Sequence, residues 1–571
     1  MLSRRDYERF RVSPTDPATI RVDDVEKIIA NLASNSAGRL RIENFAESFE
    51  GRPISLTSLG SGRTRVLMWS QMHGDEPTHT AVVLDLMSYL LSAPPLPLAH
   101  DILANCTLSI IPLLNPDGAE RISRFNAQGI DVNRDARRLA TPEGRALRRA
   151  VETLKPDFGF NLHNQNARRS VGTPPKPAAV SVLAPSADAA ATPTPHMRRA
   201  KQLAACFVDA VRPFAEGMIS RYDDQFEPRA FGDTIQASGT VAMLVEAGGW
   251  PEADPEPLVR LHFHGMLSTL HAIATGRIAH IDPQIYESLP ESNSRDLFDV
   301  LIHGGHVLDA HHGAAYKADL GIDHSHGSRL AVTSNRDGKI VEIGDLSTTA
   351  GKSTIDAAGC LILPGRAAFL ANWTPKIDLA GAQLESLLSQ GVTSVMGSLN
   401  LADREAIEAL SASRGLPINW GFVGSLDSSR SFSRQQLVEH VAVAAARGML
   451  AVVGNHADEA LWQQLDHFGL PLLQANQLPR IDASPPGYRE LAQQIDGLHK
   501  KLGLGATRGR IGRGCYADFQ LFDVGADLPS LPPPDWRHLK RLVVAGETVW
   551  ENGKRVGGTP GVSLKRAEAF D

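Results

Sequence analysis

Two histidines and two glutamates follow predicted strands at separate places in the chain. His73 and Glu76 come after an apolar run at 65–72, His163 ends a run at 156–162, and Glu246 ends a run at 241–245. Two imidazoles and one carboxylate form the ligand set of a catalytic zinc site, which keeps a fourth position for water. Such a site also needs a carboxylate that is not a ligand, because the attacking water must lose a proton. We therefore expect a zinc site at His73, Glu76 and His163, with Glu246 as the general base.

Polar residues between these groups can bind a substrate. Asn133 and Arg134 lie in the loop beyond the apolar run at 107–114, and Arg124 precedes them. A guanidinium binds a carboxylate through two parallel hydrogen bonds, so Arg134 is a candidate for holding a substrate carboxylate. Arg124 is a candidate for stabilising the oxyanion that forms at the reacting carbonyl. The alternative for Arg134 is a surface ion pair with Asp131 or Asp135.

The elements that must position these residues alternate between strand and helix. Apolar runs at 65–69, 107–114, 158–162 and 241–245 predict buried strands, and helical patterns lie between them at 78–92, 143–154, 196–215 and 257–276. Such alternation predicts a mixed, mostly parallel α/β sheet with helices on both faces. Ligands bind at the carboxyl ends of the strands in sheets of this kind, so the polar groups should converge there. The Pro- and Ala-rich stretch at 171–195 predicts a long surface loop.

The order of these motifs resembles that of the zinc carboxypeptidases of the carboxypeptidase A type. The shared motifs are His-Gly-Asp-Glu at 73–76, Asn-Pro-Asp-Gly at 115–118, the run from Arg124 to Asp135, Asn-Leu-His at 161–163, and Glu246 after an apolar strand. The resemblance covers residues 5–275. A single histidine after a strand is more often a surface residue than a ligand, but the ordered set of motifs is specific.

The resemblance implies a role for each of these residues, with one Zn²⁺ per chain. Tyr222 is the only tyrosine in the region where the family places one that closes over the substrate. His79 falls in the first turn of the helix expected after Glu76, where it can support the ligands from behind. The other implied roles are zinc binding by His73, Glu76 and His163, water activation by Glu246, oxyanion stabilisation by Arg124, and binding of the terminal carboxylate by Asn133 and Arg134.

Two separated segments of the second half, 298–365 and 508–560, consist of short β runs with glycine turns. They resemble the β-sandwich of the amidohydrolase superfamily, and residues 366–507 resemble barrel segments of its urease α-subunit and D-aminoacylase branches. The His-x-His metal pair of that superfamily is missing from residues 366–373. Only about 145 residues separate the two sandwich segments, whereas a complete (β/α)₈ barrel typically needs about 250. We therefore expect a shortened, barrel-like region without metal ligands.

The expected organisation has three parts. Residues 1–280 form a zinc carboxypeptidase-like catalytic domain, residues 298–365 and 508–560 form a β-sandwich, and residues 366–507 form a truncated α/β barrel. The second half would restrict access of substrate to the catalytic cleft or join copies of the chain. A homo-oligomer assembled through this half is therefore a working hypothesis.

Composition excludes several classes of protein. The chain has 571 residues, of which 42% are hydrophobic and 21% charged, as in a multidomain globular protein. Its net charge of −6 excludes a broad basic surface, so we expect neither a nucleic-acid nor a membrane partner. The first residues lack the apolar core of a secretory signal, and the four cysteines have no CxxC spacing. These features predict a cytoplasmic protein.

The sequence therefore favours a zinc-dependent hydrolase that cleaves an amide bond next to a free carboxylate. The substrate would be a peptide, cleaved before its C-terminal residue, or an N-acyl amino acid. One alternative is a deacylase that acts on a small amidated metabolite. The alternative from another class is a non-catalytic scaffold or binding protein built from two degenerate enzyme halves. No residue identifies itself as the selector of the substrate's side chain.

Overall fold

The computed structural model divides the chain into two compact units. The first comprises residues 1–297, and the second lies within residues 298–571. The structure describes all residues except 223–224, 252–253, 293–296, 310–313, 325–337, 375–378, 380, 402, 410–415, 426–432, 448, 454–469, 475–477, 479–486, 503, 506, 526–534, 558–559 and 561–571.

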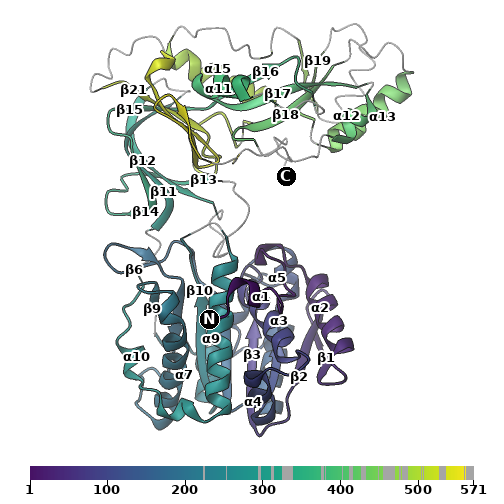
Figure 1. Cartoon of the computed structure of the whole chain (residues 1–571), viewed down its shortest axis with the longest axis vertical. Helices are drawn as coiled ribbons and strands as arrows, with labels where there is room; N and C mark the ends of the chain where they lie inside the picture. The colour runs from purple at the N-terminus through teal and green to yellow at the C-terminus, as the bar shows by residue number, and fades with distance from the viewer. Residues whose placement is uncertain are drawn as a thin grey trace. The chain divides into compact units, whose positions relative to one another are not determined.

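An eight-stranded mixed sheet forms the centre of the first unit, in the order β1-β2-β4-β3-β5-β10-β8-β9 (Figure 1). The inner strands β4, β3, β5 and β10 run parallel to one another, whereas β2 pairs antiparallel with both β1 and β4. At the other edge β8 pairs antiparallel with β10 and parallel with β9. The strand bounds are β1 Leu40–Glu47, β2 Pro53–Leu59, β3 Thr64–Ser70, β4 Cys106–Ile111, β5 Phe158–Asn164, β8 Val180–Leu183, β9 Ile219–Arg221 and β10 Val241–Ala247. A separate short ribbon pairs β6 (Ser170–Val171) with β7 (Lys176–Pro177).

Helices cover both faces of this sheet because successive strand residues point to opposite sides. Val66 and Met68 of β3 pack with the helices of one face, and Leu67 and Trp69 pack on the other. The first face carries α2 (Val22–Asn35), α3 (Thr78–Leu90), α4 (Pro97–Asn105), α7 (Pro195–Val211) and α9 (Glu256–Ala274), and the second carries α6 (Pro142–Leu154) and α8 (Phe231–Ala237). The short helices α1 (Arg4–Tyr7), α5 (Pro116–Glu120) and α10 (Gln284–Glu287) complete the unit.

The predicted fold class of this unit is confirmed, with one local difference. Each of the four expected strands is present, and each of the four expected helices lies within a few residues of its predicted bounds. The stretch 171–195 is not wholly a surface loop, because its residues 180–183 form the buried strand β8 beside β10. The Pro- and Ala-rich composition around this run concealed four consecutive buried positions, which is the pattern of a strand covered on both faces.

Two sheets make up the described part of the second unit. The larger sheet takes strands from both ends of the unit, and β15 pairs antiparallel with β21. Its strands are β11 (Leu297–Leu308), β12 (Ala315–Asp323), β13 (Lys339–Gly344), β14 (Ala350–Asp356), β15 (Cys360–Pro364), β21 (Phe519–Asp523), β22 (Leu539–Val544), β23 (Glu547–Glu551) and β24 (Lys554–Arg555).

The smaller sheet of the second unit is parallel and is built from the intervening residues. Its strands are β16 (Arg366–Leu370), β17 (Val392–Asn400), β18 (Asn419–Ser425), β19 (Ala451–Val453) and β20 (Leu472–Leu473), with helices α11 (Gly381–Ser389), α12 (Arg404–Glu408), α13 (Arg434–Ala446) and α15 (Tyr488–Lys501). Arg366, where the sequence lacks the expected histidine pair, is buried with its guanidinium 4.5 Å from the centre of the Trp536 ring. Position 366 therefore holds an arginine that stacks on an aromatic ring.

None of the helices in the described residues combines the length and the apolar character needed to cross a membrane.

The turn that carries His73 and Glu76 packs tightly against the Asn-Pro-Asp-Gly motif. Asn115 caps α5 by accepting a hydrogen bond from the Gly118 amide at 2.9 Å, and its own amide group donates to the Met72 carbonyl at 3.2 Å. A Cβ atom at Gly74 would overlap the backbone of Gly118 and Ala119. Glycine is therefore required at position 74 by the close approach of two backbones.

Replacing Gly74 with alanine should push these two backbones apart. We expect Gly74→Ala to lower the free energy of unfolding by about 1–3 kcal/mol, the usual cost of overpacking, and to reduce bound zinc. Chemical denaturation followed by circular dichroism, together with elemental analysis, measures both effects. Gly497→Ala is the control, because nothing surrounds a Cβ atom there and alanine favours its helix α15. A wild-type midpoint and zinc content in Gly74→Ala would contradict this account of the turn.

Candidate active site

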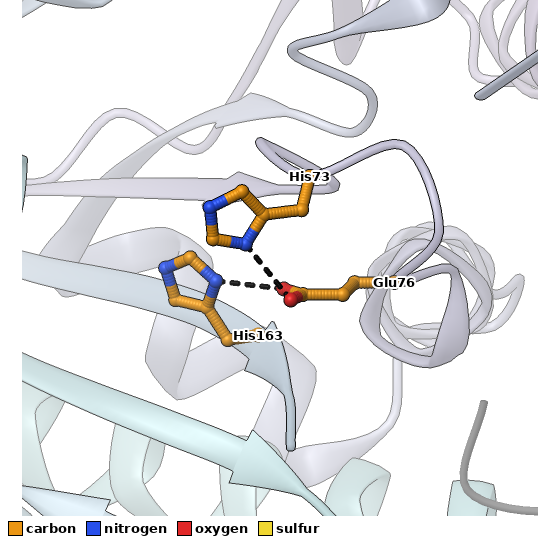
Figure 2. A group of neighbouring side chains, drawn as sticks. All are labelled: His73, Glu76 and His163. Carbon is orange, nitrogen blue, oxygen red and sulfur yellow. Dashed lines mark hydrogen bonds and ion pairs between the residues drawn. The ribbon is translucent and has the colours of Figure 1, made fainter. Parts of the chain in front are cut away.

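Three of the sequence-predicted residues form one buried group at the carboxyl ends of the parallel strands (Figure 2). His73 lies in the turn after β3, Glu76 lies just before α3, and His163 lies near the end of β5. The Glu76 carboxylate faces both imidazoles, with Oε1 2.8 Å from His73 Nδ1 and Oε2 2.7 Å from His163 Nδ1. All three side chains are at most 3% exposed.

The donor set of this group fits a small divalent cation. One potential ligand atom from each residue lies within 4.8 Å of the other two, and zinc takes imidazole and carboxylate ligands at about 2.0–2.2 Å. Although burial opposes ionisation of Glu76, the two imidazoles hold its pKa well below the ordinary value. The carboxylate is therefore ionised and can bind a metal. In the described residues, this is the group of three that could hold an ion.

Glu246 stands next to this group on the adjacent strand. In the parallel pairing of β5 with β10, Glu246 is directly opposite His163. The carboxylate is buried, and its Oε2 atom has no hydrogen-bond partner in the described residues. Burial, reinforced by the negative charge of Glu76, raises the pKa of Glu246 well above its usual value. Glu246 is therefore a carboxyl group that binds a proton more readily than an ordinary exposed glutamate does.

Tyr222 and Arg169 lie beside Glu246. The Glu246 carboxylate accepts a hydrogen bond from Tyr222, and its charge, followed by burial, raises the pKa of the Tyr222 hydroxyl. The Arg169 guanidinium lies 5.0 Å from the centre of the Tyr222 ring and donates to Ser292 Oγ at 2.8 Å. Sequence reasoning did not single out Arg169, because no motif distinguishes it from its neighbour Arg168.

Asp131 links the zinc-ligand candidates to Arg124. Its Oδ1 atom is 3.1 Å from His73 Nε2, and its Oδ2 atom accepts hydrogen bonds from Arg124 Nε at 3.0 Å and Nη2 at 2.8 Å. Arg124 Nη1 in turn lies 3.6 Å from Glu76 Oε1. Asp131 therefore orients both an imidazole and a guanidinium, as carboxylates behind metal-binding histidines commonly do. The sequence named Asp131 only as an alternative partner of Arg134.

Asn133 and Arg134 lie on the next turn, η2 (Val132–Arg134). The Asn133 backbone amide donates to Asp131 Oδ1 at 2.9 Å, and its side-chain oxygen accepts from the Phe231 amide at 3.0 Å. Arg134 does not pair with Asp131 in this structure, because Asp131 is engaged by Arg124 and His73. It instead forms an ion pair with Glu227, with Arg134 Nε 3.7 Å from Oε2.

A buried histidine pair supports His163 from behind. His79 Nδ1 lies 2.9 Å from the His163 carbonyl oxygen, and His79 Nε2 lies 3.0 Å from His262 Nδ1. His262 Nε2 lies 3.2 Å from the Ala179 carbonyl oxygen. Burial lowers the pKa of His262 to about 4, so this histidine is neutral at pH 7. His262 lies on α9, nearly two hundred residues from His79 by sequence, and no local pattern connects the two.

Residues 25–176 match the family model described as Zinc carboxypeptidase. This range contains His73, Glu76 and His163 and ends before Glu246. Carboxypeptidase SOL1 of Arabidopsis thaliana is 29% identical over 120 residues, which are 20% of this chain and 24% of that relative. The chain thus spans about a quarter of the length of this curated relative.

Solved structures align at low identity. A metallo-carboxypeptidase from Burkholderia cenocepacia aligns with 20% identity and a TM-score of 0.36, over 45% of this chain and 69% of that chain. A D-aminoacylase mutant aligns with 14% identity and a TM-score of 0.34, over 47% of this chain and 100% of that chain. The match of residues 25–176 to the family model places a zinc carboxypeptidase-like region within the first unit.

Proposed function

We propose that the first unit is a zinc-dependent hydrolase that cleaves an amide bond next to a free carboxylate. The substrate would be a peptide, which loses its C-terminal residue, or an N-acyl amino acid. The observation that carries this proposal is the position of Glu246, opposite His163 on adjacent strands and beside the buried group of His73 and Glu76. A base next to a metal-ligand set is the minimum that amide hydrolysis by water requires.

In this proposal His73, Glu76 and His163 hold one zinc ion. The zinc would polarise the scissile carbonyl and make water acidic enough to attack at neutral pH. Glu246 takes the proton of the attacking water on its unpartnered Oε2 atom and passes it to the leaving amine. The raised pKa of Glu246 suits this transfer, because a strongly acidic carboxyl would not retain the proton.

Arg124, Asn133 and Arg134 would bind the two negatively charged groups of the reacting substrate, which are the oxyanion and the free carboxylate. Arg124 is held by Asp131 with one guanidinium nitrogen 3.6 Å from Glu76, where it can stabilise the developing oxyanion. Asn133 and Arg134 would hold the free carboxylate of the substrate. Tyr222, which contacts Glu246, would cover the bound residue.

We also propose that this catalytic domain comprises residues 1–280. All strands of the eight-stranded sheet and all the helices of eight or more residues that cover it end before residue 280. The second unit would then restrict access of substrate to the catalytic cleft or join copies of the chain, and it would take no part in the hydrolysis.

Replacing Glu246 with glutamine tests the base. We expect Glu246→Gln to lower kcat by about 10²–10⁴-fold, the usual contribution of a general base, while zinc remains near one ion per chain. Turnover of an N-blocked dipeptide and elemental analysis of the purified protein measure the two quantities. Glu43→Gln, at an exposed position of β1, is the matched control. Undiminished turnover in Glu246→Gln would remove Glu246 from the mechanism, and loss of zinc would make it a ligand.

Blocking the substrate's carboxylate tests Arg134. We expect the Arg134→Gln variant to lose roughly ten- to a hundredfold in kcat/KM on a free-acid substrate, because a charged hydrogen bond contributes about 1.5–3 kcal/mol. The same substrate as its C-terminal amide should be cleaved equally slowly by wild type and variant. If the variant lost activity equally on the acid and the amide, Arg134 would not be the carboxylate anchor.

Replacing Asp131 with asparagine tests its role in orienting His73. We expect Asp131→Asn to weaken zinc binding about 10–100-fold, as is usual for carboxylates behind metal-binding histidines. Competition with a chelator measures the zinc affinity directly. Asp209→Asn, at an exposed position of α7, should leave it unchanged. Equal zinc affinities in the two variants would show that the contact between Asp131 and His73 contributes little to metal binding.

A further inference from the structure

Four arginines line one pocket beside the candidate active site. The pocket has a volume of about 380 Å³ and is lined by Arg134, Arg137, Arg138 and Arg229. All four residues are exposed, so their guanidinium groups remain available to a dissolved ligand. Its volume is large enough to hold an amino-acid side chain.

The positive charge of this pocket is only partly balanced. Glu227 is 3.7 Å from Arg134 and accepts a hydrogen bond from Arg229 Nε at 2.8 Å. The hydrogen bond from Arg229 lowers the pKa of Glu227 to about 2, so this carboxylate is ionised at neutral pH. Neither Arg137 nor Arg138 forms an ion pair with a described residue. Among the residues described here, Glu227 is the carboxylate within 4.0 Å of these guanidinium groups, while Asp131 and Asp233 act on Arg229 and Arg134 through longer-range charge interactions.

The pocket is connected to the zinc-ligand candidates by a short chain of contacts. Asp131 contacts His73 and also accepts the amide of Asn133, the residue before Arg134. A backbone hydrogen bond of 3.0 Å from the Ala136 amide to the Arg229 carbonyl joins the two segments that carry the arginines. The pocket is therefore built on the same turn that would bind the substrate's terminal carboxylate.

We propose that this pocket binds the side-chain carboxylate of the substrate's C-terminal residue, so that the preferred substrates end in glutamate or aspartate. This inference rests on the proposed hydrolase function. One arginine is enough to bind a terminal carboxylate through two hydrogen bonds. The remaining guanidinium groups are available to bind a second anion, whereas they would repel a lysine or arginine side chain. A peptide that ends in glutamate or aspartate and an N-acyl glutamate or aspartate both carry this pair of carboxylates.

Paired substrates that differ only in charge test the proposal. Benzoyl-Gly-Glu and benzoyl-Gly-Gln represent peptides, and benzoyl-Glu and benzoyl-Gln represent N-acyl amino acids. We expect kcat/KM to be at least about tenfold higher for the glutamate member, equivalent to about 1.4 kcal/mol. The preference should shrink as salt is added, because the arginines are exposed and screened over about 8 Å at 0.15 M ionic strength. Cleavage of the benzoyl-Gly pair would identify peptides as the substrates, and cleavage of the benzoyl amino acids would identify N-acyl amino acids.

Variants of the pocket residues that do not hold the terminal carboxylate complete the test. A double variant with Arg137→Gln and Arg138→Gln should lose the preference for glutamate while still cleaving the glutamine substrate at the wild-type rate. Arg229→Gln is a second, independent variant of the same pocket. Arg41→Gln, at an exposed position on β1, should keep the full preference. An unchanged preference in both pocket variants would overturn the assignment.

A binding measurement separates failure of this proposal from failure of the proposed function. Isothermal titration compares glutarate with glutaramate, in which an uncharged amide replaces one carboxylate. If no substrate is cleaved but glutarate binds more tightly, the pocket stands and the hydrolase proposal fails. If both ligands bind equally, or the glutamate and glutamine substrates are cleaved equally well, the pocket does not select a second carboxylate.

Discussion

The Glu76 carboxylate lies between two buried imidazoles, and the arrangement of the first unit follows from keeping it there. An ionised group in a protein interior must be paired with an opposite charge and with hydrogen-bonding partners. His73 follows β3 and His163 lies near the end of β5, and these two neighbouring strands end close together. Asp131 then contacts the His73 imidazole, and His79 contacts the backbone carbonyl of His163, both from outside the group. The charge at the centre thus constrains strand order, loop geometry and helix placement together.

Close backbone packing provides the second constraint. Asn115 reaches from one loop to the carbonyl of Met72 in another, and Gly74 allows the two loops to touch. Asp117 adds hydrogen bonds from Ser48 Oγ at 2.8 Å and from Arg52 at 2.6 Å, which tie a third loop to the same place. The Asn-Pro-Asp-Gly motif therefore holds three loops together next to the site. Its residues hold the loops whose side chains do the chemistry.

The sequence predicts the parts of this unit that have a regular period or a fixed motif order. The runs that predict buried strands, such as 107–114 and 241–245, are mostly apolar, and His73, Glu76 and His163 lie at or just beyond strand ends that must meet. Strand β8 escaped prediction because four buried residues among prolines and alanines form too short a run to stand out. Asp131 and His262 escaped because their roles depend on contacts between segments far apart in the chain. Tertiary pairing of this kind leaves no local signature.

The larger sheet of the second unit has a consequence for how the protein is made. Strand β15 ends at residue 364, and its partner β21 begins at residue 519. A ribosome therefore delivers the whole five-stranded parallel sheet before the larger sheet can close. During that interval β15 exposes an unpaired edge, a surface that invites association with other chains. The parallel sheet can form from nearby segments as it emerges, so vectorial synthesis favours completing this inserted region first and sealing the edge last.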